Sequence, residues 1–140
     1  MVYVDTSVFV ALCVNEPKSA AVARWYAASS EILTSAVWCV TEFASAVGVK
    51  QSTDQITHEQ GAAAWQAFER LCGSDLQLLP IDPAIFHRAA VLTLDDPGGL
   101  CAGDALHLAA AMEAKVKSIA TLDAGLARHA KRLKIKPLTF

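Results

Sequence analysis

Short apolar runs alternate with longer helix-like segments along the whole chain. The short runs have the length of buried strands, and they lie at 2–4, 32–34, 76–81, 118–121 and 136–140. The longer segments have helical spacing or helix-starting residues, and they begin at 6, 19, 37, 57, 83, 104 and 124. Strands that alternate with helices in this way predict an α/β fold, a three-layer α/β/α sandwich around a mostly parallel central sheet.

The composition fits one folded domain over residues 1–140. Hydrophobic residues make up 54% of the chain and charged residues 19%, which excludes a disordered chain. No apolar run approaches the roughly 20 residues of a membrane-spanning helix, and the opening MVYVDTS does not have the pattern of a signal peptide. We therefore expect a cytoplasmic protein. The four cysteines show no metal-binding spacing, so we expect buried free thiols.

Charge is distributed unevenly along the chain. Residues 114–140 contain seven Lys or Arg and one acid, a balance of +6, whereas residues 1–113 contain five basic and thirteen acidic residues, a balance of −8. A basic segment beside an acidic body is compatible with an anionic polymer as partner. A solvated helix face has the same composition, so charge alone does not decide between the two.

Four carboxylates have no basic partner nearby in the sequence. Asp5 and Asp123 follow the first and fourth predicted strands, so in a parallel sheet they are expected at the same edge. Glu42 is the only charge in the segment AVWCVTEFASAVGV, and Asp104 opens the apolar helix DALHLAAAM. Segments that are apolar on nearly every face predict buried helices. A carboxylate on such a helix is costly unless its charge is compensated.

Each of these acids also has a structural interpretation. Asp5 and Asp123 can cap the helices that follow them, Asp104 can interact with a helix dipole, and Glu42 can form half of a buried salt bridge. Acids that converge in one crevice repel each other unless they are protonated or share a cation, and Mg²⁺ and Mn²⁺ prefer oxygen ligands. We therefore favour a metal site that activates water for attack on phosphate. His107, one turn after Asp104, is interpreted as structural because an all-oxygen site needs no histidine.

The same segments resemble the PIN-domain family, specifically the VapC-like ribonuclease toxins of toxin–antitoxin pairs. The matching stretches are, in order, VYVDTSVFVAL, VTEFASAV, CAGDALHLAAAM and ATLDAGLARHAKRLKIKPL. The resemblance implies a catalytic, metal-binding cluster of acids with supporting hydroxyl groups; the acids are Asp5, Glu42, Asp104 and Asp123, and the hydroxyls belong to Thr6, Ser7 and Thr121. Cys101 departs from the pattern, because the position three residues before the third acid is often Arg in such toxins.

The resemblance also implies an activity and partners. A single PIN-like domain of this kind would be a Mg²⁺- or Mn²⁺-dependent endoribonuclease that hydrolyses RNA, forms a homodimer and is held inactive by a cognate antitoxin protein. Arg128, Lys131 and Arg132 are the candidates for contact with RNA phosphates.

Two other functions fit the pattern less well. A receiver-like phosphotransfer domain usually has an early acidic pair, and here only Asp5 is present. A non-catalytic interaction module with the same fold is expected to have lost an acid, whereas Asp5, Glu42 and Asp104 are all present.

Overall fold

The computed structural model describes residues 1–140 as five strands and seven helices. The strands are β1 (Val2–Val4), β2 (Leu33–Ala36), β3 (Leu76–Leu79), β4 (Ser118–Ala120) and β5 (Lys136–Leu138). The helices are α1 (Thr6–Cys13), α2 (Ser19–Ala28), α3 (Trp38–Ser52), α4 (His58–Ser74), α5 (Pro83–Asp95), α6 (Ala102–Glu113) and α7 (Ala124–Arg132). Each predicted element is present, with ends that differ by a few residues. None of the helices has the length and hydropathy that a membrane crossing requires.

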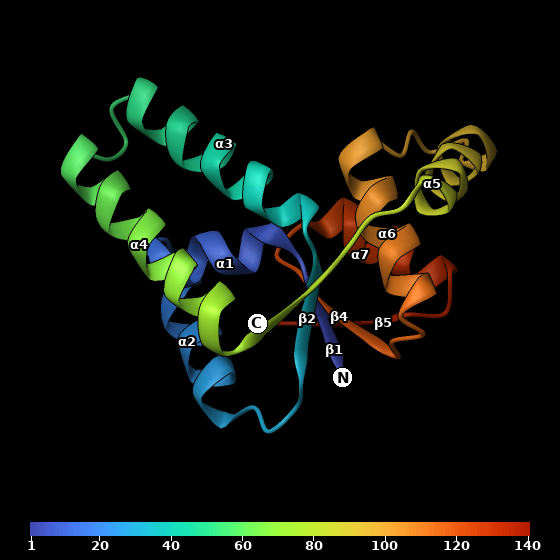
Figure 1. Cartoon of the computed structure of the whole chain (residues 1–140), viewed down its shortest axis with the longest axis horizontal. Coiled ribbons are helices and arrows are strands. Elements are labelled where there is room, and N and C mark those ends of the chain that lie inside the picture. The colour runs from blue at the N-terminus through green and yellow to red at the C-terminus, as the bar shows by residue number, and fades with distance from the viewer.

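Helices cover both faces of the sheet, with α1 to α4 on one side and α5 to α7 on the other (Figure 1). Successive side chains of a strand point to opposite faces, and β1 follows this rule. Val2 and Val4 belong to the core cluster shared with α1, α3 and α4, whereas Tyr3 belongs to the cluster shared with α5, α6 and α7. The predicted α/β/α sandwich is therefore confirmed.

The sheet has the strand order β3-β2-β1-β4-β5, and every neighbouring pair is parallel. The chain moves outward from β1 to β3, then returns to the other side of β1 for β4 and β5. In open parallel sheets ligands bind at the carboxyl ends of the strands where the order reverses, which here lies between β1 and β4. The receiver-like alternative is wrong, because that class has the order 2-1-3-4-5.

The two helices expected to be buried differ from each other. Helix α6 confirms the prediction, since every residue from Ala105 to Ala111 is buried. Helix α3 contradicts it, because only Cys39, Phe43 and Val47 are buried. The buried face packs on α1 and α4, where Phe43 stacks on Phe68 with ring centroids 4.1 Å apart. The other positions of α3 are half-buried or exposed, and several of them carry small residues such as Ala44, Ser45 and Gly48.

The cysteines are free thiols, as predicted, but only Cys39 is fully buried. Cys13 and Cys72 are half-buried, and Cys101 is exposed. Cys101 is exposed because it is the residue immediately before α6, where the chain is still a surface loop.

Candidate metal centre

The four acids reach one open hollow from four different elements. The hollow has a volume of about 340 Å³ at the carboxyl ends of β1 and β4, and it is lined by Asp5, Thr6, Ser7, Glu42, Ser45, Ala46, Asp104 and Asp123. Asp5 directly follows β1, and Asp123 lies between β4 and α7. Glu42 comes from the second turn of α3, and Asp104 comes from the first turn of α6. The fold thus brings together acids that are up to 118 residues apart in the sequence.

Asp5 is buried and held through one of its two oxygens. Its Oδ2 accepts hydrogen bonds from Ser7 Oγ at 2.5 Å, from the Ser7 backbone N–H at 3.3 Å and from Thr121 Oγ1 at 2.9 Å. The hydroxyls in turn accept bonds from the β4–α7 connection, with Leu122 N donating to Ser7 and Asp123 N donating to Thr121. Ser7 and Thr121 therefore fix Asp5 against the segment that carries Asp123, and no hydrogen bond reaches Oδ1.

Glu42 is held in the same way, through Oε2. This oxygen accepts a hydrogen bond from Thr6 Oγ1 at 2.6 Å and another from His107 Nε2. Burial raises the pKa of Glu42, but the hydrogen bonds and the charge of His107 outweigh burial and hold this pKa below its usual value. The other oxygen, Oε1, lies against Gly103, where an added Cβ would be only 2.8 Å away. Glu42 is therefore a fixed carboxylate anion.

Asp104 and Asp123 complete the hollow. Asp123 is exposed and caps α7, since its Oδ1 accepts from Leu126 N at 2.9 Å. Burial and the negative charges of Asp123 and Asp5 raise the pKa of Asp104, which the Cys101 thiol opposes. Burial is the largest cause of this shift, and the charge of His107 offsets only part of it. A cation in the hollow would stabilise the ionised form of Asp104.

His107 lies behind the acids rather than in the hollow. Its side chain is 1% exposed, and Nε2 lies 3.7 Å from Asp5 Oδ1 as well as bonding to Glu42. One ligand atom from each of Asp5, Glu42 and His107 falls within 4.8 Å of the others, a spacing that a metal ion could bridge. Both ring nitrogens are already used, however, because Nδ1 is 2.8 Å from Tyr3 Oη. The ligand set that faces the hollow is therefore made of oxygens.

The three residues predicted to contact RNA do not form one group. Arg128 and Lys131 are exposed and make no salt bridge. Lys131 lines a separate hollow of about 400 Å³ together with Lys134 and Lys136. Arg132 instead pairs with Asp96 at 3.2 Å.

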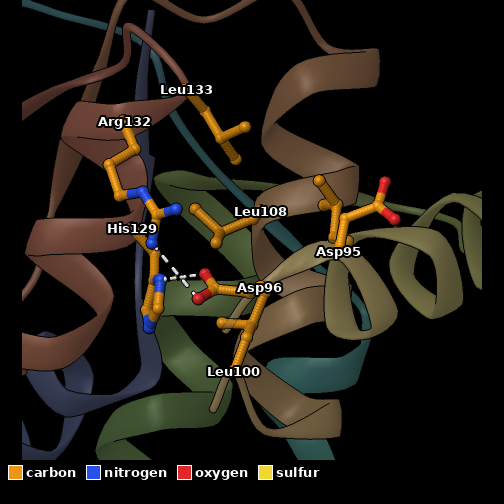
Figure 2. Close-up of a pocket in the computed structure, with 8 residues that line it drawn as sticks. Asp95, Asp96, Leu100, Leu108, His129, Arg132 and Leu133 are labelled. Atoms are coloured by element: carbon orange, nitrogen blue, oxygen red, sulfur yellow. Dashed lines mark hydrogen bonds and ion pairs between the residues drawn. The ribbon is translucent and has the colours of Figure 1, made fainter. Parts of the chain in front are cut away.

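The Asp96–Arg132 pair is part of a clasp, the set of contacts that Asp96 makes with Gly98, His129 and Arg132 and that joins the turn before α6 to α7 (Figure 2). Asp96 points between His129 and Arg132 of α7, with its Oδ2 2.6 Å from His129 Nδ1. Its Oδ1 also accepts from the Gly98 backbone N–H at 2.7 Å. Asp95 points away from these groups (Figure 2). The clasp joins the segment that leads to Asp104 with the helix that Asp123 caps.

An open parallel sheet with an acidic hollow at its point of reversal defines a class of α/β proteins that bind ligands at the strand ends. The sequence model of the PIN domain matches residues 2–132, so the chain belongs to the PIN-domain family. No curated protein sequence matches the chain.

Three solved structures share the fold at low sequence identity. VapC20 of Mycobacterium tuberculosis, a sarcin–ricin loop cleaving toxin, has a TM-score of 0.73 at 14% identity, covering 91% of this chain and 94% of its own. FitAcB from Neisseria gonorrhoeae has a TM-score of 0.68 at 20% identity, covering 99% and 97%. FitAB bound to an IR36 DNA fragment has a TM-score of 0.70 at 18% identity, covering 99% and 94%. These likenesses extend over nearly the whole of each chain.

Proposed function

We propose that the protein is a Mg²⁺- or Mn²⁺-dependent endoribonuclease, the toxin component of a toxin–antitoxin pair. The observation that carries this proposal is the way the hollow holds its acids. Hydroxyl and imidazole donors fix Asp5 through Oδ2 and Glu42 through Oε2, which leaves Oδ1 and Oε1 as the oxygens proposed to face a cation. The four carboxylates that line one hollow repel each other unless they share such a cation.

The donor set fits a hard divalent cation. Asp5, Glu42, Asp104 and Asp123 are the proposed metal ligands and catalytic residues, all with the oxygen donors that Mg²⁺ and Mn²⁺ prefer. When bound, such an ion supplies an activated water and offsets the charge that develops on the phosphate. In this proposal Ser7, Thr6 and Thr121 keep the carboxylates in place through their hydroxyl groups.

RNA as the substrate is proposed on two grounds. VapC20, which shares the fold, is a toxin that cleaves the sarcin–ricin loop. The exposed Arg128 lies one turn into the helix that Asp123 caps, and Lys131 follows it on the next turn. Unpaired basic side chains at this place are suited to phosphates of a strand that enters the hollow. We leave Arg132 out of this role because Asp96 engages it.

The partners follow from the same family resemblance. We propose a homodimer in the cytoplasm, held inactive by a cognate antitoxin that covers the hollow. Light scattering of the purified chain at several concentrations tests the homodimer, and a single monomer mass throughout would contradict it. The antitoxin is tested by isolating the tagged chain from its source cells, where we expect a co-purifying protein that blocks RNA cleavage; RNA cleavage unaffected by every co-purifying protein would contradict it.

The experiment for the site is Mn²⁺ binding, measured by titration calorimetry on the wild type and on Asp104→Asn. We expect the wild type to bind Mn²⁺ and the variant to bind it at least tenfold more weakly. Asp54→Asn is the matched control, because Asp54 lies in the α3–α4 turn outside the hollow. Wild-type binding that Asp104→Asn leaves unchanged would contradict the metal site.

Cleavage of RNA is tested separately with a pool of structured and single-stranded RNAs. Loss of cleavage in Asp104→Asn, with Asp54→Asn active, supports the nuclease. Metal binding without cleavage of any RNA in the pool would favour the non-catalytic interaction module.

A further inference from the structure

Glu42 differs from the other three acids in its place on its helix. Asp5 and Asp123 are N-cap residues, and Asp104 lies in the first turn of α6. Acids at these positions are stabilised by the partial positive charge of the helix N-terminus. Glu42 is the fifth residue of α3, which begins at Trp38, so it lies beyond the reach of that effect. Its charge and its direction must be set by other groups.

Those groups form a continuous chain of hydrogen bonds behind the hollow. The backbone N–H of Ala36, at the end of β2, donates to Tyr3 Oη at 3.0 Å. Tyr3 Oη is 2.8 Å from His107 Nδ1, and the two rings meet edge to face with centroids 5.8 Å apart. His107 Nε2 then contacts Glu42 Oε2. Tyr3 and His107, the side chains that precede Glu42 in this series of hydrogen bonds, are fully buried.

The geometry fixes the direction of the last bond. Tyr3 Oη accepts from the Ala36 backbone N–H, so its own hydroxyl proton is available to His107 Nδ1. A neutral ring that accepts at Nδ1 carries its proton at Nε2, and a protonated ring carries protons on both nitrogens. In either state Nε2–H donates to Glu42. The glutamate oxygen Oε2 is therefore held from inside the fold.

We propose that His107, oriented by Tyr3, is a positioning residue that turns Glu42 so that Oε1 remains available to the cation. His107 and Thr6 take Oε2, and Oε1 fills the space that Gly103 leaves by having no side chain. Partners that orient a metal ligand in this way typically change metal affinity 10- to 100-fold when they are removed. This inference rests on the proposed metal site.

The test compares two substitutions of His107 in the full chain. In His107→Gln the side-chain amide can still donate to Glu42 from about the position of Nε2. In His107→Leu a side chain of similar size fills the space without a donor. We expect His107→Gln to bind Mn²⁺ within about threefold of the wild type, and His107→Leu to bind it at least tenfold more weakly. Equal affinity for the leucine variant and the wild type would overturn the inference.

A purely structural role of His107 would change stability in both variants and leave the affinity of the folded protein unchanged. Tyr3→Phe covers the case in which His107→Leu does not fold, because it removes only one hydroxyl. We expect Tyr3→Phe to weaken Mn²⁺ binding in the same direction, and unchanged binding would remove Tyr3 from the proposal.

A crystal structure of metal-free His107→Leu separates this inference from the proposed function. We expect the Glu42 carboxylate to leave its wild-type position. If the wild type binds no Mn²⁺ and the carboxylate has moved, the metal site fails while the positioning role stands. If the carboxylate has not moved, the positioning role fails whatever the metal result.

Discussion

Substitution of Gly103 by alanine should weaken metal binding at least tenfold while the protein still folds. An alanine Cβ at this position would lie 2.8 Å from Glu42 Oε1, whereas ordinary contacts begin at 3.4 Å. The carboxylate must therefore move by about 0.6 Å, the difference between the two distances. Metal sites require ligand distances within about 0.2 Å of their preferred values. A displacement of this size is enough to disrupt a ligand.

The cost to folding is expected to be small, because the clash falls on the end of a side chain and not on backbone. Overpacking costs about 1–3 kcal/mol, and replacing glycine by alanine in a helix returns about 1 kcal/mol. The net destabilisation is then about 0–2 kcal/mol. Metal affinity should fall at least tenfold, which corresponds to about 1.4 kcal/mol of binding free energy.

The assay is chemical denaturation with and without Mn²⁺. At a metal concentration of 100 times the wild-type Kd, binding stabilises the wild type by about 2.7 kcal/mol. A tenfold weaker variant gains only about 1.4 kcal/mol at the same concentration. Gly48→Ala is the matched control, because no atom lies within 4 Å of its added Cβ. It should gain about 0.5–1 kcal/mol of stability and keep the full metal effect. The same metal-induced stabilisation in Gly103→Ala and wild type would refute the reasoning.

Three further outcomes are expected. In the metal-free protein, Asp104→Asn should be at least as stable as the wild type in urea denaturation, because it removes one of several mutually repelling charges; a clear loss of stability would argue against that repulsion. The pKa of the Asp96 carboxyl is held below 3.8 by the Gly98 backbone N–H, Arg132 and His129, so the stabilisation from ionised Asp96 is present above pH 3.8 and is lost as the pH falls through the folded-state pKa. Asp96→Asn should therefore have a lower free energy of unfolding than the wild type at pH 6, and the difference should narrow toward pH 3. A difference that does not change with pH would contradict this. In the Asp104→Asn background, Arg128→Gln and Lys131→Gln should each reduce the salt dependence of single-stranded RNA binding by about 0.7 in log–log slope, whereas Arg132→Gln should leave the slope unchanged.

The order of the elements could be predicted because short stretches of the sequence carry the signals for strands and helix starts. Thr57 and Gln60 form the capping box that begins α4, and Asp82 with Pro83 begins α5. The end of β2 is different. A strand is predicted at 32–34, but pairing of Ser35 and Ala36 with β3 extends it to Ala36. Pairing with a strand more than 40 residues away has no local signal.

The site could be predicted only in part for the same reason. Local motifs identify the four acids, and parallel strands bring Asp5 and Asp123 to one edge. The partner of Glu42 is 65 residues away in the sequence, and the partner of His107 on its other side is 104 residues away. The spacing of Asp104 and His107 is the one available signal, and it places His107 on the correct helix face. This spacing does not identify the groups to which the His107 ring hydrogen-bonds.

For the two acids at strand ends, the sequence left capping and metal binding as alternatives, and the structure makes both possible at once. A carboxylate has two oxygens, and Asp123 uses Oδ1 to cap α7 at 2.9 Å from Leu126 N. Asparagine caps a helix nearly as well as aspartate, whereas alanine costs about 1 kcal/mol. Asp123→Asn should therefore keep the stability of the metal-free protein, and Asp123→Ala should lose about 1 kcal/mol. Both should weaken Mn²⁺ binding, because neither has a charged oxygen to offer. If Asp123→Asn binds Mn²⁺ as the wild type does, Asp123 is only a cap.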